Sequence, residues 1–128
     1  MSAEGIKKKI LIVDDEPSSI LILRSCLQKD GFEVFEATNG YEALSLVKKN
    51  IPDLIIMDQM MPKMDGIKTA GLLKVDTRFS KIPVIMLTAS ADKADQRLSE
   101  QVGISAFMNK PLNTEAILAK IKVLLGQG

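Results

Sequence analysis

The 128-residue sequence contains no histidine and only one cysteine, and both shortages narrow the chemistry open to it. Without imidazole the chain has no histidine general base, no His-ligated zinc and no phosphohistidine of its own. Cys26 lies in an apolar stretch with helical spacing and has no second cysteine for a disulfide, so we interpret it as a packed core thiol. Any chemistry must therefore rest on carboxylates, hydroxyls and lysines.

The sequence also lacks a long apolar run and a strong net charge. It has no stretch of 18 or more apolar residues and none of the regions of a signal peptide, which predicts a cytoplasmic protein with no membrane partner. Lys and Arg number 17 against 16 Asp and Glu, for a net charge of +1. We therefore expect no direct binding of nucleic acid, and interpret the run Lys7–Lys9 as solvated.

What the sequence does contain is five short apolar segments that alternate with segments of helical spacing. Its length predicts a single domain over residues 1–128, with a core from about 8 to 125. Continuous apolarity predicts strands buried on both faces, and the intervening segments are long enough to connect parallel strands. We predict an α/β fold with a five-stranded parallel sheet, doubly wound as (βα)5. The predicted strands are Ile10–Val13, Phe32–Ala37, Asp53–Met57, Pro83–Leu87 and Ser105–Met108.

Local signals predict where the helices between these strands begin and end. The first helix follows Pro17 and stops at Gly31, and the third follows Gly66. The fifth starts near Asn113, which is a good N-cap. The fourth is mostly polar, which predicts that it is the least firmly packed. Its thin apolar stripe consists of Ala91, Ala94, Leu98 and Val102.

Charged or hydroxyl side chains stand where four of the predicted strands end. Because the carboxyl ends of parallel strands meet at one edge of a sheet, these side chains should lie close together. Clustered carboxylates repel one another unless a cation offsets them, and an all-oxygen ligand set suits Mg²⁺ better than zinc. Each residue alone also fits helix capping, a turn or a simple ion pair, but their joint placement favours a site. The residues are Asp14, Asp15 and Glu16 after the first strand, Asp58 closing the third, Thr88 closing the fourth and Lys110 after the fifth.

Four motifs, in this order and at these spacings, resemble the receiver domains of two-component response regulators, and the chain looks chemotaxis-regulator-like. The resemblance spans about Lys8 to Leu125. It implies the flavodoxin-like strand order 2-1-3-4-5 and a cis Lys110–Pro111 bond. The motifs are Ile12–Glu16, Asp58–Gly66, Pro83–Ala89 and Lys110–Pro111.

The resemblance further implies a role for each residue at the metal site. Asp58 would be the phosphoacceptor, supplied by a sensor histidine kinase, a histidine phosphotransfer protein or a small acyl-phosphate-type donor. Asp15, Asp58 and the backbone carbonyl of Met60 would bind Mg²⁺ directly, and Asp14 through a water. Lys110 would pair with the phosphoryl oxygens.

Switching is the second implication of the resemblance. Thr88 would donate a hydrogen bond to the phosphoryl group, and Phe107 would then swing inward, although Phe107 fits core packing equally well. The surface of the fourth helix, fifth strand and fifth helix would be read by an unidentified downstream protein, and could also pair two copies of the chain. Such a domain is no enzyme beyond its own phosphorylation and dephosphorylation. The apolar Met60 and small Ser90 predict a long-lived phosphoryl group.

Other functions receive less support from the residues. An aspartyl phosphotransferase or phosphatase would carry a second acid two residues after Asp58, where Met60 stands. A flavin- or nucleotide-binding module would carry a glycine-rich loop after the first strand. A phosphorylation-independent interaction scaffold of the same fold stays open, as does the choice between a stand-alone protein and a piece of a longer regulator or hybrid kinase.

Overall fold

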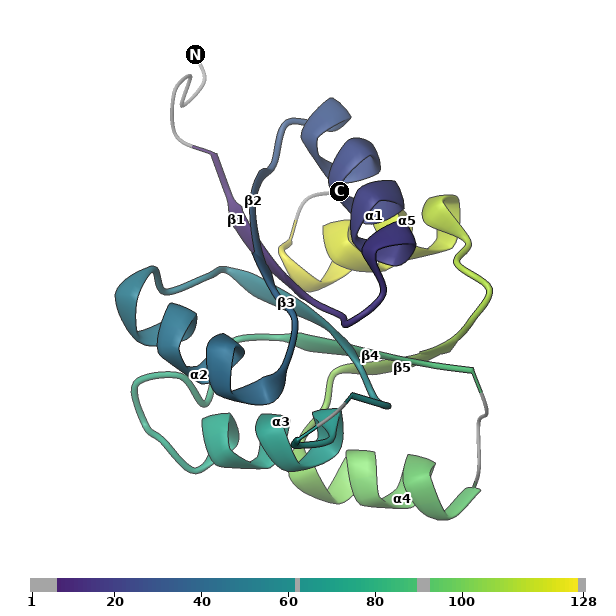
Figure 1. Cartoon of the computed structure of the whole chain (residues 1–128). Helices are drawn as coiled ribbons and strands as arrows, with labels where there is room; N and C mark the ends of the chain where they lie inside the picture. Colours follow the sequence, from purple (N-terminus) through teal and green to yellow (C-terminus); the bar gives the residue numbers. More distant parts are fainter. Residues whose placement is uncertain (1–6, 62, 90–92, 127–128) are drawn as a thin grey trace.

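The computed structural model of the protein describes residues 7–61, 63–89 and 93–126, without the side chains of 93–96. Five parallel strands form one sheet in the order β2-β1-β3-β4-β5, which confirms the predicted fold class and strand order. Helices α1 and α5 cover one face of the sheet, and α2, α3 and α4 lie on the other (Figure 1). The elements are β1 (Lys9–Val13), α1 (Pro17–Lys29), β2 (Glu33–Ala37), α2 (Gly40–Lys49), β3 (Leu54–Asp58), α3 (Gly66–Lys74), β4 (Val84–Thr88), α4 (Lys93–Val102), β5 (Ala106–Asn109) and α5 (Thr114–Leu124).

The central strands are buried on both faces, which explains their continuous apolar sequences. Every residue of β3 and β4 is buried. Because successive side chains of a strand point to opposite faces, alternate residues enter two separate cores. Ile55 and Met57 of β3 join the core under α2 and α3, whereas Leu54 and Ile56 join the core under α1 and α5.

Three strands run one residue further toward their carboxyl ends than the apolar segments predict. Pairing in the sheet continues through Asp58 in β3, Thr88 in β4 and Asn109 in β5. All three residues are polar, so apolarity alone could not include them. The extension matters for function because it makes Asp58 part of the sheet rather than of a loop.

The helix ends follow the local signals in the sequence. Pro17 occupies the first turn of α1, and Gly31 lies just beyond its end with a left-handed φ of 92°. The Asn113 side chain caps α5 by accepting a hydrogen bond from the Ala116 N–H. Helix α3 begins at Gly66 rather than after it, because the Asp65 side chain accepts from the Lys68 N–H at 2.8 Å.

Helix α4 departs from the predicted apolar stripe. Leu98 was expected to be buried and is 47% exposed, whereas Ser99 is 2% exposed. Compared with the predicted stripe, the buried face of α4 is rotated about the helix axis by about one residue. Ser99 and Val102 face inward, and α4 packs against α3. Ala91 and the side chain of Ala94 lie outside the described residues. Within the described part of the chain, no helix is long and apolar enough to span a membrane.

Candidate functional site

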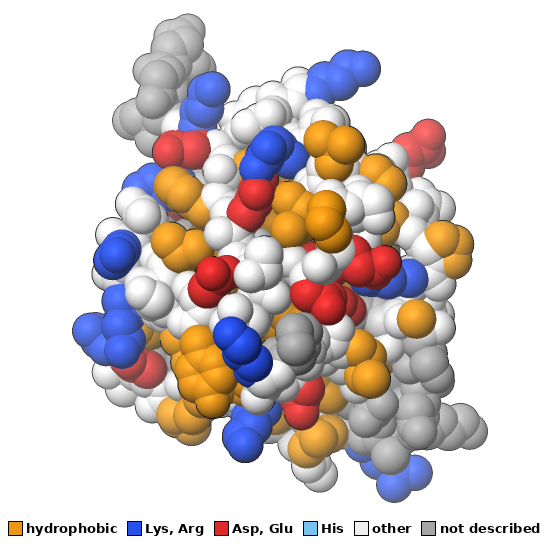
Figure 2. All heavy atoms as spheres, viewed as in Figure 1, with side chains coloured by type: hydrophobic (Ala, Val, Ile, Leu, Met, Phe, Trp, Pro, Cys, Tyr) orange, Lys and Arg blue, Asp and Glu red, His pale blue; other side chains and the backbone are white. Residues whose placement is uncertain are grey.

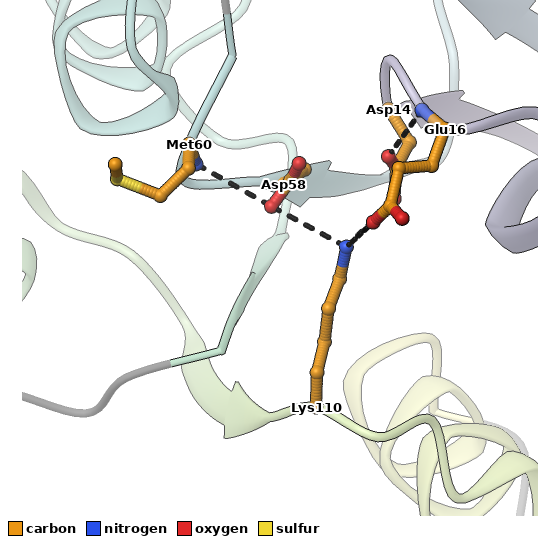
Figure 3. Close-up of polar contacts among 5 residues, drawn as sticks. All are labelled: Asp14, Glu16, Asp58, Met60 and Lys110. Carbon is orange, nitrogen blue, oxygen red and sulfur yellow. Dashed lines mark hydrogen bonds and ion pairs between the residues drawn. The ribbon is translucent and has the colours of Figure 1, made fainter.

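The charged side chains predicted to share a site come from the ends of three strands and point to the same side of the sheet. Asp14 directly follows β1, Asp58 is the last residue of β3 and Lys110 directly follows β5. Side chains alternate between the two faces along each strand, and by this alternation all three lie on the face that α1 and α5 cover. Parallel pairing in register brings these strand ends to one edge, where the side chains converge (Figure 3).

Three carboxylates form the acidic part of the site. Asp14, Asp15 and Asp58 each offer an oxygen atom, and these atoms all lie within 4.8 Å of one another. Asp14 and Asp58 are buried, whereas Asp15 is exposed. Figure 2 shows acidic side chains gathered in the middle of the face seen in Figure 1, with hydrophobic side chains beside them.

Lys110 is the cation of the site and contacts three carboxylates. Its Nζ lies 3.1 Å from Glu16 Oε1, 3.3 Å from Asp14 Oδ2 and 3.6 Å from Asp58 Oδ1 (Figure 3). Burial works to lower the pKa of Lys110, but these carboxylates outweigh it and raise the pKa above its usual value. The ammonium is therefore held in its charged form.

Asp58 holds a proton more readily than an ordinary aspartate. Burial and the neighbouring Asp14 together raise the pKa of Asp58 to about 6, although Lys110 and the Met60 N–H, 3.4 Å from Asp58 Oδ1, act to lower it. One ammonium does not balance three clustered carboxylates. A proton or a metal cation beside Asp58 would remove the imbalance.

The backbone around Asp58 is held by a close approach of α3. A Cβ at Gly66 would lie 2.4 Å from the Asp58 carbonyl oxygen and 3.0 Å from Gln59 Cα. The Gly66 N–H donates to the Gln59 carbonyl at 2.8 Å. Glycine at this position therefore lets the start of α3 rest directly on the end of β3.

The residues present fit a magnesium ion. The donors are oxygen atoms, as Mg²⁺ prefers, and a thiolate or imidazole ligand for zinc is not among them. The site opens into a cavity of about 240 Å³, large enough to keep waters or a small anion beside the carboxylates. The cavity is lined by Asp15, Glu16, Asp58, Met60, Ala89 and Lys110.

The two residues predicted to switch lie nearby, on the opposite face of the sheet. Thr88 ends β4 and is 1% exposed, and its carbonyl accepts a hydrogen bond from the Lys110 N–H at 2.6 Å. Phe107 pairs in register with Met86 and packs, half-buried, against the core under α2 and α3. Neither side chain lines the 240 Å³ cavity. The Lys110–Pro111 bond is cis, and Ser90 lies outside the described residues.

Glu16 takes a part in the site that the sequence did not reveal. It stood in the predicted acidic cluster, but no role was assigned to its side chain, which forms the shortest of the three contacts to Lys110. One feature of the sequence indicates another role for this side chain: Glu16 stands at the N-cap of α1, before Pro17, where serine, threonine, aspartate or asparagine would cap better.

Sequence comparisons agree with this geometry. A family model described as "Response regulator receiver domain" matches residues 10–122. The alkaline phosphatase synthesis transcriptional regulatory protein PhoP of Bacillus subtilis is 37% identical over 120 residues, which are 94% of this chain and 49% of PhoP. The polar-differentiation response regulator DivK of Brucella anthropi is 35% identical over 119 residues, which are 93% of this chain and 97% of DivK. The chain thus spans about half of PhoP and nearly all of DivK.

Solved structures with the same fold lead to the same family. The chemotaxis response regulator CheY4 of Vibrio cholerae superposes with a TM-score of 0.87 at 30% identity, covering 93% of this chain and 99% of CheY4. The signal receiver domain of a signal transduction histidine kinase from Syntrophus aciditrophicus gives a TM-score of 0.86 at 35% identity, covering 93% of this chain and 90% of that one. With the family model covering most of the sequence, the chain belongs to the receiver domain family of two-component response regulators.

Proposed function

We propose that residues 8–125 form one phosphoacceptor receiver domain in which Asp58 accepts a phosphoryl group. Phosphorylation by a histidine kinase is the general function of this family. The observation that carries the proposal for this chain is the position of Asp58, buried beside Asp14 and Asp15 with Lys110 Nζ at 3.6 Å. The carboxylate also faces a cavity open to a donor.

The transfer would need only the Asp58 carboxylate as nucleophile. One carboxylate oxygen bonds to phosphorus while the P–N bond to the kinase histidine breaks, and the imidazole nitrogen keeps the electron pair. Asp58 then carries an acyl phosphate. In the return step a water oxygen attacks phosphorus, the P–O bond to Asp58 breaks, and phosphate leaves with the carboxylate restored. Any catalysis by the chain is limited to these two steps on itself.

The acidic cluster supports a Mg²⁺ requirement. Asp15, Asp58 and the backbone carbonyl of Met60 would hold the ion directly, and the buried Asp14 through a water. When bound, the ion supplies positive charge for the phosphoryl oxygens during in-line transfer. Lys110 pairs with the remaining negative charge from the side of β5.

The response to phosphorylation would run through the other face of the sheet. The Thr88 carbonyl is hydrogen-bonded to the Lys110 N–H, and Phe107 lies on the next strand, β5. New acceptor oxygens at Asp58 would accept a hydrogen bond from the Thr88 hydroxyl, and the movement of Thr88 would shift the α4–β5–α5 surface. A downstream protein, or a second copy of the chain, would bind this surface. The cytoplasmic location stays a prediction.

Asp58→Asn tests the proposal. With Mg²⁺ and acetyl phosphate, the wild-type chain should gain the mass of one phosphoryl group, and beryllofluoride should bind with one site per chain. Both should be lost in Asp58→Asn. Asp65→Asn is the matched control, because it changes an acid in the same loop while asparagine still caps α3. Labelling that survives in Asp58→Asn would refute the proposal.

A further inference from the structure

The Glu16 side chain lies at the start of α1 but contacts Lys110 instead of capping the helix. It is the N-cap residue of α1, yet its side chain makes no capping hydrogen bond. The carboxylate instead extends to Lys110, 94 residues away, and Oε1 accepts from Nζ at 3.1 Å (Figure 3). Its backbone N–H meanwhile donates to Asp14 Oδ1 at 2.9 Å. One residue therefore contacts both a buried acid and the cation of the site.

Hydrogen bonds to Glu16 and Asp14 take up two donors of the Lys110 ammonium group, and Asp58 lies beyond hydrogen-bond distance. An ammonium has three N–H donors. The three carboxylates of Glu16, Asp14 and Asp58 surround Nζ at 3.1, 3.3 and 3.6 Å. A phosphoryl group on Asp58 can take the third donor as it stands, but a second N–H of Lys110 reaches it only if Asp14 or Glu16 is released.

Burial decides which carboxylate is released. The Asp14 side chain is 1% exposed, so losing Lys110 would leave a buried carboxylate without its cation. The Glu16 side chain is 59% exposed and would be hydrated as soon as it left Lys110. Glu16 is therefore the partner that an incoming phosphoryl group displaces. A phosphoryl group carries roughly −1.5 to −2 charges at neutral pH, so Glu16 would also repel it.

We propose that Glu16 is a positioning residue that competes with the phosphoryl group for Lys110 and thereby restrains the phosphorylated state. The inference rests on the proposed phosphorylation of Asp58. In the unphosphorylated protein Glu16 holds Lys110 at the mouth of the cavity. Its loss should favour the anion-bound state without providing any ligand to the anion.

The test compares Glu16→Gln and Glu16→Asp with wild type. Beryllofluoride is titrated at saturating Mg²⁺ by calorimetry, and Mg²⁺ alone is titrated separately. Glu16→Gln should bind beryllofluoride about threefold more tightly, the size expected for release of an exposed ion pair. Glu16→Asp keeps the charge but is too short for the same contact, so its affinity should rise less. Glu33→Gln, an exposed acid at the opposite end of the sheet, is the control for net charge.

The two titrations separate positioning from a merely structural role. Under the proposal, Glu16→Gln binds beryllofluoride more tightly while its affinity for Mg²⁺ alone is unchanged or weaker. Unchanged or weaker beryllofluoride binding in Glu16→Gln would overturn the role of Glu16, as would equal tightening in Glu33→Gln. A wild-type chain whose beryllofluoride binding does not depend on Asp58 would instead overturn the proposed function itself. Thermal unfolding of each variant verifies that α1 stays folded.

Discussion

The two faces of the sheet hold different parts of the proposed switch. On the side of α1 and α5 lie Asp14, Asp58 and Lys110, which are tied to one another by ion pairs across β1, β3 and β5. On the side of α2, α3 and α4 lie Thr88, a buried polar residue at the end of β4, and Phe107, which packs against the apolar core of that face. In the proposed switch, the charged side binds the phosphoryl group, and Thr88 and Phe107 carry the response to the other side.

The central strand β3 and the edge strand β5 also differ in packing. Every residue of β3 is buried, whereas three residues of β5 are half-buried and the fourth, Asn109, is exposed. Buried, paired charges resist displacement, whereas partly exposed apolar residues can repack at small cost. A phosphoryl group on one side is expected to change the surface on the other, because a backbone hydrogen bond joins Lys110 to Thr88 at the boundary.

Removing the cation should have the largest effect on the charged side. Lys110→Gln leaves the buried Asp14 and Asp58 without their ammonium and should lower the free energy of unfolding by about 3 kcal/mol. Urea denaturation at pH 7 without divalent cations measures it. The double variant Lys110→Gln, Asp58→Asn should recover a large part of this loss. A single variant as stable as wild type would mean that the ion pairs do not hold the charged side together.

Removing the negative charge of Asp58 should raise the free energy of unfolding rather than lower it. The pKa of folded Asp58 is about 6, above its ordinary value of 3.8, so its protonation favours the folded state. That stability is fully present below pH 3.8 and is lost as the pH rises through about 6. Asp58→Asn should therefore be more stable than wild type at pH 7.5 without Mg²⁺, by on the order of 2 kcal/mol.

Urea denaturation of both proteins from pH 4 to pH 7.5 checks this expectation. The stability difference between Asp58→Asn and wild type should shrink steadily toward the acid end. A constant difference across the range would show that the carboxylate of Asp58 is not the titrating group.

Gly66 tests whether the side of α2, α3 and α4 supports the charged side through the backbone. In Gly66→Ala the new methyl group would meet the Asp58 carbonyl at 2.4 Å, so α3 must move, at a cost of about 1 to 2 kcal/mol. Gly71→Ala in the same helix is the control, because its Cβ meets only Val102, at 3.9 Å. Gly71→Ala should stabilise by about 0.5 kcal/mol. Equal effects on stability would mean that the close approach at Asp58 is unimportant.

The parts of the molecule differ in how far the sequence predicts them. Apolar runs and the residues at their ends were enough for the five strands and for the convergence of Asp14, Asp58 and Lys110, because pairing in register brings strand ends to one edge. The strand order followed instead from the resemblance to receiver domains. The orientation of α4 was missed at Leu98, since a polar helix has too few apolar residues to define its buried face. The Glu16–Lys110 contact was missed because an exposed, flexible side chain can reach several partners.

Thr88 offers a smaller test, aimed at the link between the two sides. Thr88→Ala removes the hydroxyl that is proposed to bond the phosphoryl group, and should weaken beryllofluoride binding by about 1 kcal/mol. Thr88→Ser, which keeps the hydroxyl, should bind nearly as wild type. Amide chemical shifts of β5 should change on binding in Thr88→Ser and much less in Thr88→Ala. Equal shift changes in both variants would mean that the response does not pass through this hydroxyl.

Met60 should produce the smallest effect, on the lifetime of the phosphoryl group rather than on its formation. Its side chain is 69% exposed at the rim of the cavity and offers no hydrogen-bonding group to orient a water for attack on phosphorus. Met60→Asn adds such a group and should speed loss of phosphate by about threefold, less than 1 kcal/mol of barrier.

Decay of the phosphorylated chain, followed by mass after the donor is removed, measures this rate. Val75→Asn makes the same kind of polar substitution at an 80% exposed position after α3, and should leave the rate unchanged. Faster decay in Met60→Asn alone would place control of the lifetime on the charged side, with the group that is hydrolysed. Equal rates in the two variants would instead leave water access to be set elsewhere, and Ala89, which also lines the cavity, would be the next place to test.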